Sequence, residues 1–339
     1  MLARIANELY WLGRNLARAE FTARAVEAVF QAELQSTSES TPGVSFGSGG
    51  LLAMFGDVDE KPTHPRPRQA LGGHSLSGHA LGQLTLDPER PGSMLASIER
   101  AREGARTVRD VISAEMWEAI NTTALGLRGG TNWGPPTRAG FHSPAPAGPT
   151  LASQYVKERT ALIWGVANRS MLRDEAKCFL DAGGLIEISD MVLRMLRVAL
   201  PTTTSGGGAR DSAPADGHAL ILLQAVGGFH AYLRAVTAPP NARPVARFLL
   251  FERAYPDSVA ACVDSLHEVF ASADAGPRNS KPVLRVSRLA ADLDFQRRAL
   301  PDGAELTGIC EQTQQELARI DQDVAERYFA GAAAAGLRR

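Results

Sequence analysis

The stretch IANELYWLGRNLARAEFTARAVEAVFQAELQ, residues 5–35, decides the fold class of this chain. Its apolar residues recur every three to four positions, the period of one face of an α-helix. Four charged residues of the same stretch lie on the opposite side of that helix: Arg14, Arg18, Glu20 and Arg24. The pattern predicts a long amphipathic helix with one face for packing and one charged face.

The rest of the chain repeats this helical period and lacks the alternation typical of strands. We expect an all-α fold, a multi-helix bundle in which residues 1–339 form a single helical domain. Gly- and Pro-rich stretches predict a flexible loop insertion at 36–92 and loops at 128–150 and 201–217. Further helices are expected at 93–125, 153–171, 174–199, 218–236 and 303–330, with Ser93 as the N-cap of the first of these.

Composition narrows the functional classes. The net charge of -1 gives no reason to expect a nucleic-acid or membrane-surface partner. The three cysteines show no metal-ligand spacing and indicate reduced thiols, and no apolar run reaches the length of a membrane span. We therefore expect a cytoplasmic protein with no nucleic-acid or membrane partner, and the sequence predicts no metal site and no cofactor.

The first helix has a degraded counterpart 170 positions later. Such an echo predicts a duplicated helical unit with approximate two-fold symmetry, although any two amphipathic helices share a period. The equivalent pairs are Gly13 and Gly183, Arg14 and Gly184, Ala17 and Glu187, Arg18 and Ile188, Glu20 and Asp190, and Arg24 and Arg194.

Three segments carry a resemblance to a known family: LYWLGRNLARAEFTAR (9–24), ERAREGARTVRD (99–110) and DEAKCFLDAGGLIEISDMVLRML (174–196). They resemble the signature segments of the α-E family, all-helical proteins named for Glu-Arg motifs, and they occur in the family's order. That family has Leu-Gly-Arg-x-Leu-Glu-Arg-Ala-Glu/Asp in both copies. This chain departs from the pattern at Ala17, where a Glu belongs, and at Gly184 and Ile188, where arginines belong.

If the two copies face each other, Arg14 and Arg18 of the first meet Glu187 and Asp190 of the second. Such a cluster has two physical uses: fully paired and buried, it sets the specificity of packing; partly open, it binds carboxylate or phosphate. Both interpretations stay open. The candidate general bases are Glu187 and Asp190. The candidate ligand-binding residues are Arg14, Arg18, Glu20, Arg24, Arg102, Glu103, Arg106 and Arg194.

The resemblance implies a function by association. α-E proteins are implied to work with a circularly permuted ATP-grasp ligase and often a transglutaminase-like peptidase, in systems that form amide-linked peptide products or tags. By that resemblance we expect an accessory or partner subunit of an amidoligase. One alternative is an enzyme that acts on the ligase's substrate or product through the Arg/Glu cluster. The other is a purely structural scaffold.

Overall fold

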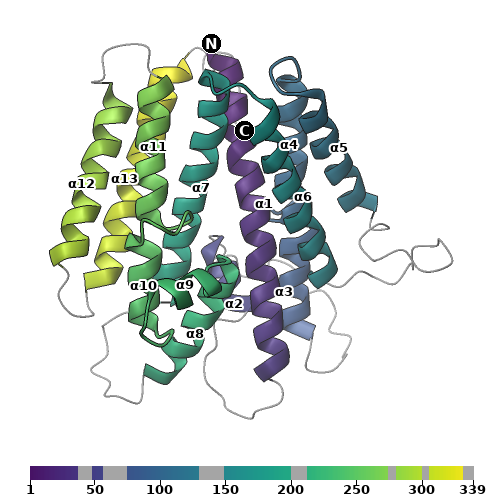
Figure 1. The fold of residues 1–339 in the computed structure, drawn as a ribbon. Helices are drawn as coiled ribbons and strands as arrows, with labels where there is room; N and C mark the ends of the chain where they lie inside the picture. Colours follow the sequence, from purple (N-terminus) through teal and green to yellow (C-terminus); the bar gives the residue numbers. More distant parts are fainter. Residues whose placement is uncertain are drawn as a thin grey trace.

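The computed structural model describes residues 1–36, 48–55, 75–129, 149–199, 212–273, 280–299 and 305–330. These ranges contain helices joined by short loops and no strand, so the predicted all-α fold is confirmed (Figure 1). The helices are α1 (Ala3–Ser36), α2 (Ser48–Met54), α3 (Ser75–Leu86), α4 (Met94–Thr107), α5 (Ala114–Gly129), α6 (Pro149–Ser170), α7 (Glu175–Ala199), α8 (Ser212–Ala225), α9 (Phe229–Ala235), α10 (Ala242–Phe251), α11 (Val259–Ala273), α12 (Lys281–Ala299) and α13 (Glu305–Tyr328).

Eight of these helices pack as two equivalent four-helix halves. In the first half α1 contacts α4 and α6, α4 contacts α5, and α5 contacts α6. In the second half α7 contacts α11 and α13, α11 contacts α12, and α12 contacts α13. Figure 1 shows the first half on the right and the second on the left. Because the same contact pattern occurs twice in chain order, the structure supports the predicted duplication over a chance match of helical periods.

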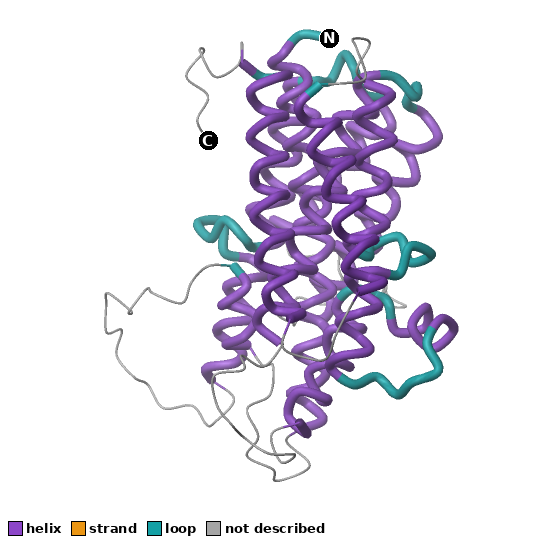
Figure 2. The backbone as a smooth tube through the Cα atoms, turned by 90° about the vertical axis from the view of Figure 1, so that its left-hand side faces the viewer, coloured by secondary structure: helices purple, strands orange, loops and turns teal. Residues whose placement is uncertain are grey.

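Helices α1 and α7 form the centre of the bundle and run in the same direction. The amino group of Met1 contacts Glu175 at 2.7 Å, and further along both helices Arg18 contacts Glu187. Figure 2 shows the long helices aligned along the length of the bundle. Their apolar faces supply fully buried residues such as Leu9, Leu16 and Leu180. Each side chain of this size contributes about 1.5–3 kcal/mol when it leaves water.

The stretch 36–92, predicted as a flexible loop insertion, contains two helices. Helices α2 and α3 lie within it and contact each other, and α2 also packs on α7. Leu51 and Met54 of α2 and Leu81 and Leu84 of α3 are buried, so a few well-spaced apolar residues anchor an otherwise polar stretch. Residues 37–47 and 56–74 lie outside the described residues.

The predicted helix 93–125 is two helices. The Ser93 N-cap is confirmed, since its Oγ accepts a hydrogen bond from the Ala96 N–H at 3.0 Å. The sequence reading missed a second cap: Ser113 Oγ accepts from the Met116 N–H at 3.1 Å and starts α5. The break lies at 108–113, between the end of α4 and this cap.

Two further boundaries differ from the prediction. The expected helix 218–236 is divided into α8 and α9 by Gly227, whose φ of 71° lies in the left-handed region that favours glycine. Residues 212–217, predicted as loop, already belong to α8, and the predicted loop 128–150 overlaps the end of α5 and the start of α6. Residues 130–148 and 200–211 lie outside the described part. None of the described helices combines the length and apolar character needed to cross a membrane.

Candidate functional site

The central contact between α1 and α7 is a pair of glycines. A Cβ added at Gly13 would lie 2.0 Å from the carbonyl oxygen of Leu180, and a Cβ added at Gly183 would lie 1.9 Å from that of Tyr10. Any larger residue would push the two helices apart. A shift of 170 positions exchanges Gly13 with Gly183 and Tyr10 with Leu180, so one contact is made twice. An approximate two-fold axis therefore passes between these helices.

On one side of this axis, two arginines of α1 hold one glutamate of α7. Arg14 Nε donates to Glu187 Oε2 at 2.9 Å, while Arg18 donates from Nε to Oε1 at 2.5 Å and from Nη2 to Oε2 at 2.9 Å. Helix α13 adds Asp321, whose Oδ1 accepts from Arg14 Nη1 at 3.0 Å and from the Tyr10 hydroxyl at 2.5 Å. We call these five residues the Arg–Glu network. The predicted meeting of Arg14 and Arg18 with Glu187 is confirmed.

The centre of the network is buried, Asp321 at its edge is 37% exposed, and the four charges balance. The exposed fraction of the side chain is 1% for Glu187, 11% for Arg14 and 20% for Arg18. Burial alone would raise the pKa of Glu187, but the charges of Arg18 and Arg14 outweigh burial and hold the pKa below the usual range of glutamate. A carboxylate held this firmly in its ionised form, with both oxygens engaged, is a weak general base. The geometry favours a structural role for Glu187.

Asp190, the other acid predicted to meet Arg14 and Arg18, contacts different groups. Its Oδ2 accepts from Arg194 Nε at 2.7 Å, one turn further along α7, and its Oδ1 accepts from Gln314 Nε2 of α13 at 2.8 Å. Because Asp190 follows Glu187 by three residues, it lies about 4.5 Å further along the helix, past the two arginines. This part of the predicted pairing is wrong.

The repeat equivalent of the Asp190–Arg194 pair is present on α1. Arg24 Nη2 donates to Glu20 Oε1 at 2.6 Å, one turn apart, as in α7. Each arginine also donates to a backbone carbonyl at 3.3 Å, Arg24 to that of Val226 and Arg194 to that of Met54. The two pairs therefore make the same kinds of contact in the two halves.

The predicted residues of α4 stand apart from the network. Arg102 Nε donates to Asn121 Oδ1 of α5 at 2.7 Å. Arg106 pairs with Glu103 at 2.6 Å, and their side chains are 64% and 38% exposed. The expectation that these residues share one ligand site with the arginines of α1 is not supported by their partners.

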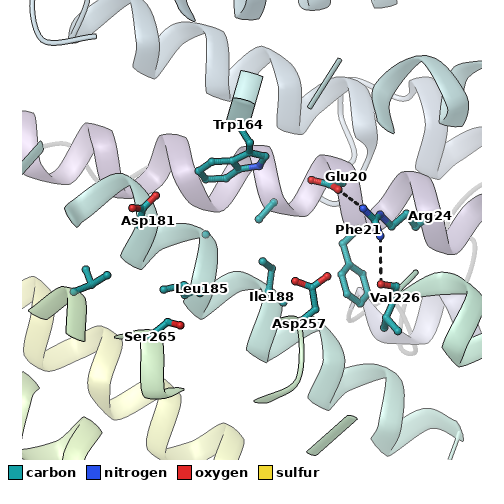
Figure 3. A pocket seen from close by; sticks show the side chains of 13 residues that line it. Glu20, Phe21, Arg24, Trp164, Asp181, Leu185, Ile188, Val226, Asp257 and Ser265 are labelled. Atoms are coloured by element: carbon teal, nitrogen blue, oxygen red, sulfur yellow. Dashed lines mark hydrogen bonds and ion pairs between the residues drawn. The ribbon is translucent and has the colours of Figure 1, made fainter. Parts of the chain in front are cut away.

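On the other side of the two-fold axis a cavity replaces the network. Exchange of the two halves puts Gly184, Ile188 and Ala17 at the positions of Arg14, Arg18 and Glu187, and all three line the cavity. Its volume is about 400 Å³, and its walls come from α1, α6, α7, α11 and the residues just before α9 and α11 (Figure 3). The cavity is the place where a second Arg–Glu network would lie.

Helix α6 covers this cavity as α13 covers the network. A Cβ at Gly184 would lie 3.1 Å from the ring of Trp164, whereas the equivalent Arg14 contacts Asp321 at 3.0 Å. Helices α6 and α13 hold the same place in the two halves. One half therefore has an aromatic cover and the other a charged one.

Three carboxylates and one guanidinium belong to the cavity wall: Glu20, Asp181, Asp257 and Arg24. Ser258 caps α11, since its Oγ accepts from the Ala261 N–H at 3.1 Å, so the cap does not use the neighbouring Asp257. The Asp257 carboxylate makes no hydrogen bond or ion pair with any residue that the structure describes. The pKa of Asp257 is raised above its ordinary value, mainly by burial. The charge of Arg24 opposes this effect, and the charge of Glu20 adds to it.

The sequence reading missed four residues of these two sites: Tyr10, Trp164, Asp257 and Asp321. Asp321 lies on α13 among other acidic residues, and nothing in the sequence around it separates it from acids that are exposed to water. The only sequence signal for the cavity was the absence of charge at Ala17, Gly184 and Ile188. Among the described residues, no group of three or more His, Cys, Asp or Glu side chains is placed to hold a metal ion.

Comparison with known proteins identifies a family and relatives that are longer than this chain. A family model named Alpha-E, described as a predicted alpha-helical domain with a conserved ER motif, matches residues 1–329. Uncharacterized proteins of Mycobacterium bovis and of Mycobacterium tuberculosis strain CDC 1551 are each 26% identical over 317 residues. The match covers 89% of this chain and 33% of each relative, so the chain spans about a third of their length. No solved structure matches the chain significantly.

Proposed function

The chain belongs to the Alpha-E family, and from this premise we propose that it is an accessory or partner subunit of an ATP-grasp amidoligase system. In this proposal a circularly permuted ATP-grasp ligase forms an amide bond in a peptide product or tag, and the present chain assists it. A transglutaminase-like peptidase is a further proposed partner. The ligase activates a carboxylate with ATP, so the chain itself needs no nucleotide site.

The observation that carries the proposal is the length of the relatives. The region equivalent to this chain is 33% of each mycobacterial protein, so this domain occurs joined to a larger remainder. A domain that is joined to a larger unit in some proteins is expected to work together with that unit. This supports a partner role.

The geometry of the Arg–Glu network supports an accessory role over catalysis through that cluster. Arg14 and Arg18 are neutralised by Glu187 and Asp321 within the fold. A substrate carboxylate would have to displace these acids and leave Glu187 buried without a partner, which costs several kcal/mol. The network therefore holds α1, α7 and α13 together.

Co-expression tests the proposal. The tagged chain is produced together with the circularly permuted ATP-grasp ligase of the same genome, and with the peptidase in a second arm. We expect the ligase to co-purify, and ATP-dependent amide formation, followed by mass spectrometry, to increase at least several-fold over the ligase alone. A Glu187→Ala chain, destabilised at its centre, is the matched negative control. Absence of a complex together with unchanged ligase activity would overturn the proposal.

A further inference from the structure

The cavity opposite the Arg–Glu network has the size of a small-molecule site. Ligand pockets in proteins measure about 300–1,000 Å³, and this cavity measures about 400 Å³. The contact of Gly13 and Gly183 sets the spacing of α1 and α7 on both sides of the axis. The helices therefore cannot move together to fill the space that the three missing charged side chains leave. The cavity is formed before any ligand arrives.

Acidic groups are in excess on the cavity wall. Glu20 is paired with Arg24, and Asp181 is paired with Lys177 through both carboxylate oxygens. Each of these two acids therefore has its own cation. Asp257 has no such partner among the described residues, and Figure 3 shows its carboxylate turned into the cavity. A cation is the missing partner of this group.

The remainder of the wall is apolar. Trp164 covers the cavity from α6, Phe21 lies at the α1 side, and Leu185 and Ile188 form the wall from α7 (Figure 3). Aromatic and aliphatic walls favour an apolar ligand body, and the face of a Trp ring also attracts cations. The ligand must combine a positive charge with apolar surface.

We propose that this cavity binds a small molecule that carries a protonated primary amine on an apolar body. The amine contacts the Asp257 carboxylate, and the body lies between Trp164 and Phe21. A partly buried carboxylate without a partner gains most from a hydrogen-bonding cation. An anionic ligand would face the Asp257 carboxylate, which has no ion-pair partner among the described residues, while the Arg24 guanidinium is already paired with Glu20.

This inference goes beyond the proposed function, because it concerns binding by the chain alone. Amidoligases join a carboxylate to an amine, so a ligand of this class is also one that the proposed partner would consume. The test below uses no ligase. A negative result would remove the amine site and leave the partnership standing, and a failed co-purification would leave the binding result standing.

Three probes of one shape separate charge from apolar burial: 2-phenylethylamine, 2-phenylethanol and 3-phenylpropionate. Isothermal titration of the full chain is expected to show 2-phenylethylamine binding at least tenfold more tightly than the other two. Equal affinity for all three would overturn the proposal in favour of a purely apolar cavity. Tighter binding of 3-phenylpropionate would overturn it in favour of an anion site.

Substitutions test which residue of the cavity contacts the ligand. Asp257→Asn removes the charge with little change of shape, and we expect at least a tenfold loss of affinity for 2-phenylethylamine. The matched control is Asp292→Asn, which removes an exposed carboxylate of α12 and is expected to leave the affinity unchanged. Unchanged binding by Asp257→Asn would contradict the assignment.

Two further measurements do not depend on Asp257. The double variant Ala17→Glu with Ile188→Arg repeats the Arg18–Glu187 pair on the cavity side, fills the space, and is expected to abolish binding. In the wild-type chain, the amine is expected to change the fluorescence of Trp164, and Trp164→Phe should remove that change. Retained binding in the double variant, or an unaltered signal in Trp164→Phe, would overturn the placement in this cavity.

Discussion

The two sides of the α1–α7 contact share one backbone arrangement and differ in what fills it. On one side Arg14, Arg18 and Glu187 form a buried, balanced network, and α13 closes it with Asp321. On the other side three small or apolar residues occupy the equivalent positions and leave a cavity under Trp164. The comparison shows that the glycine contact, rather than the charges, sets the spacing of the halves.

The same comparison separates two uses of a duplicated interface. When both copies of a charged cluster stabilise the fold, neither can be lost without cost. In this chain a single network holds the centre, and the second position is a cavity. The second position lacks both the glutamate and the arginines. A position that lacked only the glutamate or only the arginines would hold a buried charge without a partner.

The largest effect is expected from breaking the network at its shared acid. Glu187→Ala leaves Arg14 and Arg18 buried without their common carboxylate, and breaking a buried pair in this way costs about 3–5 kcal/mol. Urea unfolding followed by circular dichroism would measure the change in the free energy of unfolding. A loss below about 1 kcal/mol would mean that the network contributes little to stability.

The second-largest loss of stability is expected from substitution of the two glycines. Gly13→Ala and Gly183→Ala each place a Cβ about 2 Å from a backbone carbonyl of the other helix, and overpacking typically costs about 1–3 kcal/mol or more. Because the contacts are equivalent, we expect the two losses to agree within about 1 kcal/mol. Gly165→Ala is the control, since its Cβ would meet no atom within 4 Å, and it should stabilise α6 by about 0.5–1 kcal/mol. A large difference between Gly13→Ala and Gly183→Ala would contradict the two-fold arrangement.

Low pH should reduce the contribution of the network to the stability of the fold. Because the pKa of Glu187 is lowered in the folded chain, its contribution is complete above its ordinary value of 4.5 and is lost as the pH falls through the folded pKa. The difference in stability between the wild type and Glu187→Gln should therefore be constant near neutral pH and shrink below pH 4.5. Denaturant unfolding at several pH values tests this; a difference that grows in acid would contradict it.

The smallest effect is expected at the pairs that both halves keep. Glu20→Gln and Asp190→Asn each remove one charge of a pair one turn apart, and such pairs contribute about 0.3–0.5 kcal/mol. Thermal unfolding should show shifts of similar size for the two variants, and high salt should reduce both. A much larger loss for one of them would show that its helix end depends on the arginine-to-carbonyl bond.

Much of this arrangement was predictable from local pattern. The helical period, the Ser93 cap and the 170-residue echo are properties of neighbouring or regularly spaced residues, so the fold class and the pairing of Arg14 and Arg18 with Glu187 followed from them. Asp321 could not be predicted, because nothing in its own helix distinguishes it from solvated acids. Its role depends on where α13 packs, which is a tertiary property.

The cavity was harder to predict for a different reason. The residues that create it were recognised as departures from a pattern, but the sequence does not say whether a lost charge leaves empty space or is filled by a neighbour. Trp164 fills only part of that space, and Asp257 reaches it from the residues just before α11. Both depend on how distant helices approach the centre.

The contact of Gly13 with Gly183 also constrains the order of events during synthesis. Helix α1 leaves the ribosome before α7, and its partner glycine follows 170 residues later. At about 5–20 residues per second, that interval is roughly 10–30 s. In this time α4, α5 and α6 can cover only the side of α1 that faces the first half, and its central face stays exposed to water and to chaperones. Helix α1 is thus made before α7 but completes its packing only after α7 has emerged.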